Sequence, residues 1–248
     1  MQYKTITALH PAPARPIAHW AHTFALCAIL ALTAIYGHAR TTSGALESTP
    51  HLLRYGTSIL FEWLLLGAVI AGIYLRRSFF LQAFHHPGRS VAQSVRLGIV
   101  TYLAGYAAVL FVSGALLFTP LGHKRNTDVV LALLPHTALD FLLWFAVSLT
   151  AGICEELIFR GYLLQQLTAW TRRPLFAISI TALLFGSLHA YEGAGAILPL
   201  AALGFVYGLA VHYFRGDLRP VIVAHTLQDF LIALFALLAT HLKQIPPR

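Results

Sequence analysis

Two adjacent carboxylates, Glu155 and Glu156, and an arginine, Arg160, occur inside a hydrophobic stretch that is long enough to cross a membrane. Each charge at the centre of a membrane helix costs about 2.5–3.5 kcal/mol even on insertion scales. Glu156 and Arg160 are four residues apart, so on a helix they are neighbours whose charges neutralise each other. Glu155 points about 100° away and has no such local partner. An unpaired carboxylate of this kind is suited to accept a proton from water as a general base.

Two histidines downstream have spacings that fit the same chemistry. His189 follows Phe185 by four residues, and it lies as far after a hairpin turn expected near Arg172 as Glu155 lies before it, 17 residues in each case. Equal counts from the turn of an antiparallel helix pair give equal depth, so we expect His189 to lie opposite Glu155.

His225 and Asp229 form the third pair, again four residues apart. An acidic residue in this position can hold the other nitrogen of an imidazole and fix its tautomer. His225 comes shortly after a turn expected at residues 215–219, so it should be shallow in the membrane. If the helix that carries Glu155 protrudes on the same side, all three pairs converge at one depth.

Each of these residues also has a plainer interpretation. Glu156 and Arg160 can be a structural ion pair, and a helix histidine is often only hydrogen-bonded to a neighbour. Cys154 beside the glutamates could be a nucleophile, but a thiol in apolar surroundings is inert. Glu62 and Asp140 lie in or near predicted spans without a spaced partner, so we interpret Glu62 as a lumen or interhelix residue and Asp140 as interfacial.

The composition indicates a membrane protein. The chain has 248 residues, of which 58% are hydrophobic and 10% charged, with a mean hydropathy of +0.70. A soluble domain carries about 25% charged residues. We therefore predict an all-α fold, a polytopic transmembrane bundle of about seven to eight spans. Seven hydrophobic segments are visible, at residues 19–38, 52–75, 97–118, 139–168, 174–190, 196–214 and 220–240.

The fourth segment is unusually long. Residues 140–170 contain no proline, and about 30 helical residues span about 45 Å, against a hydrocarbon core of about 30 Å. We expect this helix to protrude on the inner side, as far as Arg172 and Arg173. The predicted organisation is three N-terminal spans in residues 1–135, a catalytic helical core in residues 136–240 and a short tail in residues 241–248.

The charge distribution predicts the orientation. The formal net charge is +8, but the basic residues are scattered among loops, which excludes a nucleic-acid-binding stripe. With the N-terminus inside, inner segments hold ten basic residues and outer segments six. This bias predicts a multi-pass protein of the cell (inner) membrane with a cytoplasmic N-terminus and an active site near the cytoplasmic face. The inner residues are Lys4, Arg15, Arg76, Arg77, Arg89, Arg96, Arg172, Arg173, Arg215 and Arg219.

Three motifs together resemble a known family. The segment EELIFR at residues 155–160 matches EExxxR, FGSLH at 185–189 matches FxxxH, and HTLQD at 225–229 matches HxxxN/D. Their order and spacing are similar to those of the CAAX-protease and bacteriocin-processing (CPBP, or Abi) intramembrane endopeptidases. The resemblance covers about residues 139–232.

The resemblance implies a role for each motif residue. Glu155 would activate the attacking water, and Glu156 and Arg160 would support it. His189 would share the water, and His225 with the residue four positions on would stabilise the oxyanion. That residue is often asparagine in the family and is Asp229 here. An ionised carboxylate cannot donate a hydrogen bond, so Asp229 must orient the histidine or be protonated. The implied catalytic residues are Glu155, Glu156, Arg160, His189, His225 and Asp229.

Some members of the family are described as metalloproteases. Glu155, His189 and His225 could bind Zn²⁺ with one position open for water. The HExxH helix signature is absent from the sequence, and we favour metal-free hydrolysis by glutamate-activated water, with zinc as the alternative.

The function predicted from these observations is an intramembrane endopeptidase that hydrolyses a membrane-associated protein or peptide within the lipid bilayer. The alternative is a non-proteolytic membrane protein. It could be a proton-coupled transporter that uses the Glu/His/Asp cluster as a relay, or a bacteriocin-immunity protein. The sequence shows no inverted repeat, which argues against a transporter.

Overall fold

The computed structural model describes residues 16–46, 48–75 and 88–243, without the side chains of residues 236–243. Throughout these ranges the chain forms helices and connecting turns and no strand, as the all-α prediction requires. Six helical stretches are long and apolar enough to cross a membrane. They are α1 (Trp20–Thr42), α2 (His51–Leu75), α4 (Val91–Leu116), Ala138–Thr171, Pro174–Glu192 and α9 (Ala194–Tyr213). A further long helix, α10 (Arg219–Lys243), corresponds to the last predicted segment, so the protein is a multi-pass membrane protein.

The predicted fourth segment is one continuous helical stretch of 34 residues, Ala138–Thr171. It consists of α6 (Ala138–Glu156), a π-helical turn η2 (Leu157–Leu163) and α7 (Leu164–Thr171). In the π turn the N–H of Leu164 donates to the carbonyl of Phe159, five residues back. The stretch ends at Arg172, which adopts the left-handed conformation with φ of 58°. The sequence predicted the length of this helix but not its π turn.

Local signals explain where several helices begin. Thr137 and Asp140 form a capping box at the start of α6, and Ser90 and Gln93 form another at the start of α4. The second box starts α4 at residue 91, six residues before the predicted hydrophobic segment. Pro174 occupies the first turn of α8 (Pro174–Leu188), where its missing N–H costs no hydrogen bond.

Short helices occupy two connections. The 3-10 turn η1 (Gly122–Lys124) and the helix α5 (Thr127–Leu133) lie in the gap that the sequence predicted between the third and fourth spans. The 3-10 turn η3 (His189–Glu192) follows α8 and leads into α9. At Gly193, between η3 and α9, φ is +94°, and a Cβ atom would lie 2.9 Å from the backbone nitrogen of Asn126. Glycine at this position lets η3 approach the connection that precedes α5.

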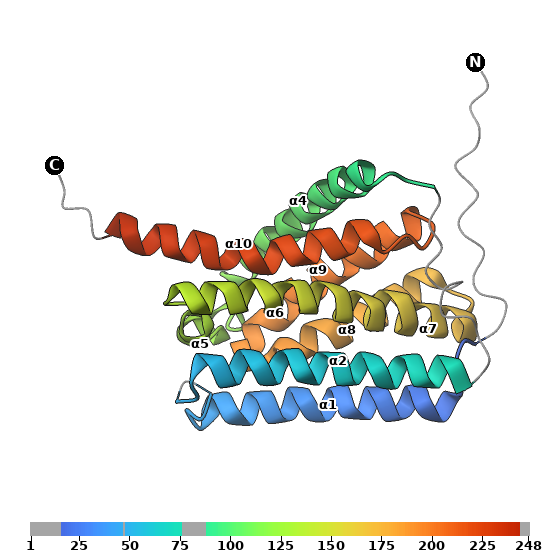
Figure 1. Cartoon of the computed structure of the whole chain (residues 1–248), viewed down its shortest axis with the longest axis horizontal. Coiled ribbons are helices and arrows are strands. Elements are labelled where there is room, and N and C mark those ends of the chain that lie inside the picture. Colours follow the sequence, from blue (N-terminus) through green and yellow to red (C-terminus); the bar gives the residue numbers. More distant parts are fainter. Residues whose placement is uncertain (1–15, 47, 76–87, 244–248) are drawn as a thin grey trace, which may run out of the picture.

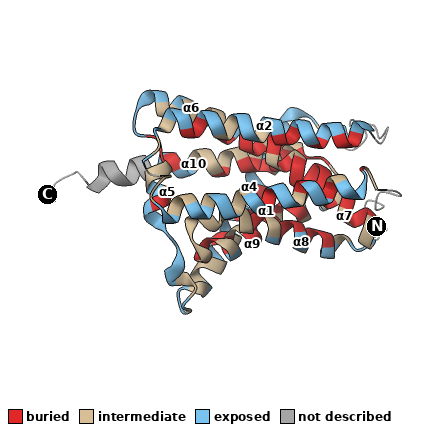
Figure 2. Ribbon diagram, turned by 90° about the horizontal axis from the view of Figure 1, so that it is seen from below, coloured by how far each residue is buried: buried red, intermediate tan, exposed pale blue. Residues whose placement is uncertain are grey.

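The helices α1, α2, α6 and α10 run along the longest axis of the molecule, and α4 is inclined to it (Figure 1). α6 packs between α2 and α10, α4 packs on α9 and α10, and α8 packs on α9, while α1 lies against η3 and α8. Buried residues gather where these helices face one another, and the outward faces are exposed (Figure 2). Large apolar side chains such as Leu32, Ile35 and Phe111 are among the exposed residues, as expected of surfaces that face lipid.

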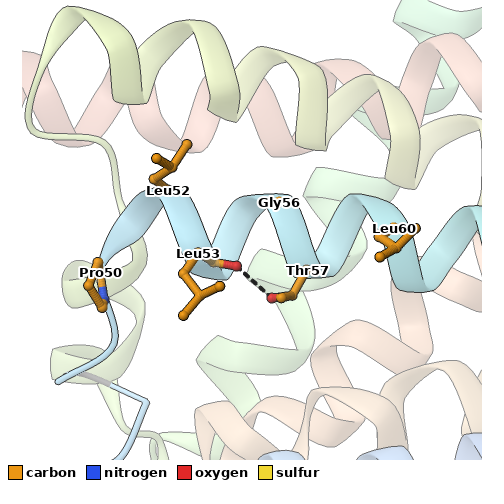
Figure 3. A pocket seen from close by; sticks show the side chains of 6 residues that line it. All are labelled: Pro50, Leu52, Leu53, Gly56, Thr57 and Leu60. Atoms are coloured by element: carbon orange, nitrogen blue, oxygen red, sulfur yellow. Dashed lines mark hydrogen bonds between the residues drawn. The ribbon is translucent and has the colours of Figure 1, made fainter.

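An apolar groove on the outer face of α2 illustrates that surface (Figure 3). The hydroxyl of Thr57 donates to the carbonyl of Leu53 at 2.7 Å, so its polar atom is satisfied within the helix. The groove therefore presents no group that could do chemistry. It is lined by Pro50, Leu52, Leu53, Gly56, Thr57 and Leu60.

Some of the sequence-based predictions fall outside the described residues. Among the charges counted for orientation these are the inner residues Lys4, Arg15, Arg76 and Arg77 and the outer residue Arg248. The same applies to the predicted tail from residue 244 onward.

Candidate active site

The site forms where α6 crosses α10, and a glycine permits the close approach. A Cβ atom at Gly152 would overlap the hydroxyl of Thr226 and lie 3.1 Å from the carbonyl oxygen of Ile222. One turn further along α6 are the two glutamates, and next to Thr226 on α10 is His225. The indole Nε1 of Trp144 also donates to the carbonyl of Asp229 at 3.0 Å. These contacts fix the register of the two helices that carry four of the six candidate residues.

Glu156 is fully buried and binds two partners through one oxygen. Its Oε1 accepts a hydrogen bond from Nη1 of Arg160 at 2.8 Å, which is the pair expected from the spacing. The same oxygen lies 2.8 Å from Nδ1 of His225. A carboxylate can only accept, so Nδ1 of His225 carries the proton and donates it to this bond. Glu156, rather than Asp229, therefore fixes the tautomer of His225.

Arg160 is a buried cation with its charge locally satisfied. Besides Glu156, it donates from Nη2 to the carbonyl of Gly204 on α9 at 3.1 Å. Its guanidinium carbon lies 4.6 Å from the ring centroid of Phe185 and 5.6 Å from that of Tyr207. A Cβ atom at Gly204 would lie 3.3 Å from Nη2 of Arg160, so only a small residue leaves room for this contact. Arg160 thus ties α9 to the end of α6, which fits the supporting role that the motif implies.

Glu155 and Asp229 face the other nitrogen of the same imidazole. Nε2 of His225 lies 3.6 Å from Oδ2 of Asp229 and 3.9 Å from Oε2 of Glu155. Within the described part of the chain, Oε2 of Glu155 has no hydrogen-bond partner. The side chain of Glu155 is 23% exposed and that of Glu156 0%, so Glu155 is the carboxylate that a water molecule can reach.

His189 lies near these residues, but on a 3-10 turn and not on an α-helix. The α-helix ends at Leu188, and His189 begins the 3-10 turn η3. Its Nδ1 lies 3.0 Å from the carbonyl of Phe185, and because a carbonyl only accepts, Nδ1 carries the proton and Nε2 can accept. The ring of Phe185 packs against both histidines, with its centroid 5.1 Å from that of His189 and 5.8 Å from that of His225. His189 also interacts electrostatically with Asp229, while its predicted approach to Glu155 stays a prediction.

The sequence interpretation missed a third helix that contributes a carboxyl group. Glu62 on α2 interacts electrostatically with Glu155, His225 and Asp229 and is hydrogen-bonded to Ser58. Its Oε2 is buried without a hydrogen-bond partner among the described residues. Glu62 is an interhelix residue, as one of the two sequence interpretations held, but its partners belong to the site. The only signal in the sequence was the energetic cost of a carboxyl group in mid-span.

Two tyrosines also border the carboxylates. Tyr191 in η3 interacts electrostatically with Glu155 and Asp229, and its hydroxyl is hydrogen-bonded to Glu192. Tyr207 on α9 is fully buried, and its hydroxyl has no hydrogen-bond partner within the described ranges. Neither residue belongs to a motif. Tyr191 donates its hydroxyl proton to Glu192, whereas the unpartnered hydroxyl of Tyr207 adds a donor to a site dominated by acceptors.

Cys154 lies beside the carboxyl groups, whereas Asp140 lies apart from them. The side chain of Cys154 is fully buried and therefore not presented to a substrate. Asp140 lies at the opposite end of α6, where it caps the helix and contacts Nδ1 of His51 at 3.3 Å.

The residues named for zinc do not form a ready metal site. In the part of the chain that the structure describes, no group of three or more His, Cys, Asp or Glu side chains is arranged to hold a metal ion. Glu155, His189 and His225 would have to move to act as ligands. As they stand, these three side chains do not fit a zinc ion, and metal-free hydrolysis remains a prediction.

Comparison with protein families identifies one domain. Residues 137–231 match the family described as type II CAAX prenyl endopeptidase Rce1-like. The matched segment begins at the capping residue of α6 and ends in α10, and it includes all six candidate residues. Comparisons with curated proteins and with solved structures found no match. The match agrees with the CAAX-protease resemblance seen in the motifs.

Proposed function

With an Rce1-like domain of the CAAX protease family at residues 137–231, we propose that this protein hydrolyses a peptide bond of a membrane-associated protein or peptide with water activated by Glu155. The family indicates a membrane protease in general terms. The observation that carries the finer proposal is the convergence of Glu155, Glu156 and Asp229 on the single imidazole of His225. Two helices far apart in the sequence meet there through residues of two motifs.

In this mechanism Glu155 is the general base. A water molecule between Glu155 and His189 loses a proton to Glu155 while its oxygen bonds to the carbonyl carbon of the substrate. The partial exposure of the Glu155 side chain supports this role, whereas Glu156 is enclosed and its Oε1 already binds Arg160 and His225. The Nε2 of His189 can accept the second hydrogen of the same water, since its Nδ1 is bonded to Phe185.

The oxyanion of the tetrahedral intermediate is stabilised by His225. Its Nδ1–H is bonded to Glu156, so a protonated imidazole presents Nε2–H toward the space that Glu155 and Asp229 border. Donors fixed in place before the reaction stabilise developing charge without a reorganisation cost. Asp229 then serves to hold the imidazole and not to donate. Glu156 and Arg160 keep the imidazole and α9 in position.

The location of the site follows the same proposal. We place the N-terminus in the cytoplasm and the site near the cytoplasmic face of the inner membrane, on the support of the loop charges. A peptide bond near a lipid-modified C-terminus would be within reach of such a site. The chemical class of substrate proposed is therefore a C-terminal peptide anchored in the bilayer by an attached lipid or an apolar segment.

The experiment is hydrolysis by purified protein in detergent, where no ion gradient exists. The probe is a synthetic peptide with a farnesylated cysteine followed by three residues, with mass spectrometry of the products. We expect a new carboxyl terminus after the modified cysteine. Glu155→Gln should lower the rate by about 10²–10⁴-fold, because an amide cannot take the proton from water.

The matched control changes the neighbouring residue, in Cys154→Ala. This variant should keep the wild-type rate if water rather than the thiol attacks. A transporter or an immunity protein would leave the peptide intact in all three samples, and near-wild-type turnover by Glu155→Gln would refute the role of Glu155.

A further inference from the structure

Glu62 is an acidic residue near the site that the three motifs do not contain. It lies in the middle of α2, a helix long and apolar enough to cross a membrane. Its Oε2 is buried and unpartnered in the described residues, as is Oε2 of Glu155 on α6. The two groups interact electrostatically, and Glu62 also interacts with His225 and Asp229. Two helices that pack on each other thus each contribute a carboxyl group with one buried, unpartnered oxygen, and these two groups interact.

The charges around Glu62 do not provide it with a cation. Arg160 donates hydrogen bonds to Glu156 and to the carbonyl of Gly204, so its positive charge is compensated by Glu156 and not by Glu62. His225 is already shared among three carboxyl groups. The hydrogen-bond partner of Glu62, Ser58, is neutral. If Glu62 were also ionised, its buried negative charge would have no cation beside it, which costs free energy. Two neighbouring carboxyl groups away from water avoid this cost by sharing one proton.

We propose that Glu62 is a second catalytic carboxyl group, the general acid that protonates the leaving amine. This inference rests on the proposed function and deepens it. Glu155 and Glu62 then form an acid–base pair across α6 and α2, with Glu155 ionised and Glu62 carrying one proton in the resting enzyme.

The proton inventory of one turnover balances. Water gives one proton to Glu155 as its oxygen bonds to the carbonyl carbon. Glu62 gives its proton to the amide nitrogen as the carbon–nitrogen bond breaks, so that a neutral amine leaves. The proton on Glu155 then passes to Glu62. The products are one carboxylic acid and one amine, and both glutamates return to their starting forms.

The two histidines of the site are less suited to this step. Nδ1 of His189 donates to the carbonyl of Phe185, which leaves Nε2 as an acceptor in the neutral ring. His225 has Nδ1 bonded to Glu156 and is assigned to the oxyanion. The direct rival is Glu155, which could pass its own newly gained proton to the amine without help from Glu62.

A matched pair of substrates tests the assignment. The amide is the farnesylated peptide, and the ester carries the same acyl part with a p-nitrophenolate leaving group. Amide cleavage needs a proton on the departing nitrogen, whereas p-nitrophenolate departs as an anion. For Glu62→Gln we expect single-turnover hydrolysis of the amide to fall about 10²-fold and hydrolysis of the ester to change less than about threefold. Glu155→Gln should lose both reactions.

The controls separate chemistry from folding. Thermal unfolding in detergent is measured for every variant, and Asp128→Asn, an exposed acidic residue on α5, should match wild type on both substrates. Glu62→Asp keeps an acid that is one methylene shorter. It should lose less amide activity than Glu62→Gln and spare the ester, and it carries the test if Glu62→Gln does not fold.

Three outcomes overturn the proposal. Equal losses on amide and ester would make Glu62 a structural residue. Unchanged rates on both would show that Glu155 returns its own proton. If the wild-type protein hydrolyses neither substrate, the proposed function itself fails, and this result is distinguishable because it does not depend on any variant.

Discussion

Nδ1 of His225 lies 2.8 Å from Oε1 of Glu156, the same oxygen that accepts a hydrogen bond from Arg160. This relationship gives the two adjacent glutamates different tasks. Glu156 is enclosed and joins α6, α9 and α10 through His225 and Arg160. Glu155, one residue earlier, is partly exposed and faces the opposite nitrogen of His225. Glu156 holds His225 and the helices in position, and Glu155 is accessible to a water molecule.

Glu156 and Arg160 should behave as a coupled pair in stability measurements. Removing one partner leaves the other charge buried and uncompensated, so Glu156→Gln and Arg160→Gln should each lower the free energy of unfolding by about 3–5 kcal/mol. The double variant should be more stable than either single variant. Thermal unfolding in detergent of the four proteins of this cycle measures the coupling, and additive losses would show that the charges do not depend on each other.

The double variant should nevertheless remain inactive. It lacks the carboxylate that fixes the tautomer of His225, and a neutral amide in its place can present either its oxygen or its nitrogen to Nδ1. Recovered stability without recovered hydrolysis would separate the two roles of Glu156.

The sequence could predict those parts of the fold and site that depend on local spacing. The long helix over residues 138–171 and the pair of Glu156 with Arg160 follow from hydrophobic length and from i,i+4 geometry, and both are confirmed. The family, inferred from three motifs, is confirmed for residues 137–231. Local spacing needs no knowledge of how helices rotate against one another, and for this reason these predictions succeed.

Contacts between helices could not be predicted in the same way. The bond between Glu156 and His225 joins residues 69 positions apart, and it depends on the close approach at Gly152. The π turn at residues 157–163 inserts an extra residue into the helical repeat, and no residue type there signals it. Glu62 faces the site because of the rotation of α2, which a uniformly apolar helix does not reveal in its sequence.

Asp229 should tolerate replacement by asparagine. Its Oδ2 lies 3.6 Å from Nε2 of His225, too long for a strong hydrogen bond, and an amide of the same shape can both accept and donate there. We expect Asp229→Asn to keep hydrolysis of the farnesylated peptide within about tenfold of wild type, and Asp229→Leu to lose about 10²-fold or more. Equal loss in both variants would mean that the negative charge itself is required.

An ion pair outside the spans gives the protein a pH-dependent stability. Asp217, between α9 and α10, is fully buried and accepts hydrogen bonds from Arg219 at 2.9 and 3.0 Å and from Arg89 at 3.0 Å. Burial alone would raise the pKa of Asp217, but the bonds from Arg219 and Arg89 lower it below its ordinary value of 3.8. A lowered folded-state pKa stabilises the protein above the unfolded value, and this stabilisation is lost as the pH falls through the folded value.

Asp217→Asn should therefore be less stable than wild type at pH 7, by about 2–3 kcal/mol, because it removes charge-assisted bonds to two arginines. The difference should stay constant down to about pH 4 and shrink only below it. Unfolding temperatures of both proteins across this range provide the measurement. A difference that already shrinks between neutral pH and about 5 would show that another group titrates.

Hydrolysis should survive the removal of metal ions. With glutamate-activated water no ion is needed to lower the pKa of the water, so dialysis against a strong chelator should leave the rate on the farnesylated peptide unchanged.

In a zinc enzyme the histidines must instead be neutral ligands at about 2.0–2.1 Å from the ion. Here Nδ1 of His189 is bonded to Phe185 and Nδ1 of His225 to Glu156, so each ring has only Nε2 left to offer a metal. Such bonds would orient an imidazole in either role, as a metal ligand or as an acceptor for water. The decisive measurement is metal analysis of active protein together with the rate before chelation, after it, and after zinc is restored. Stoichiometric zinc, with activity lost on its removal and regained on its return, would make this protein a metalloprotease and reassign Glu155 from free base to ligand or to base for a metal-bound water.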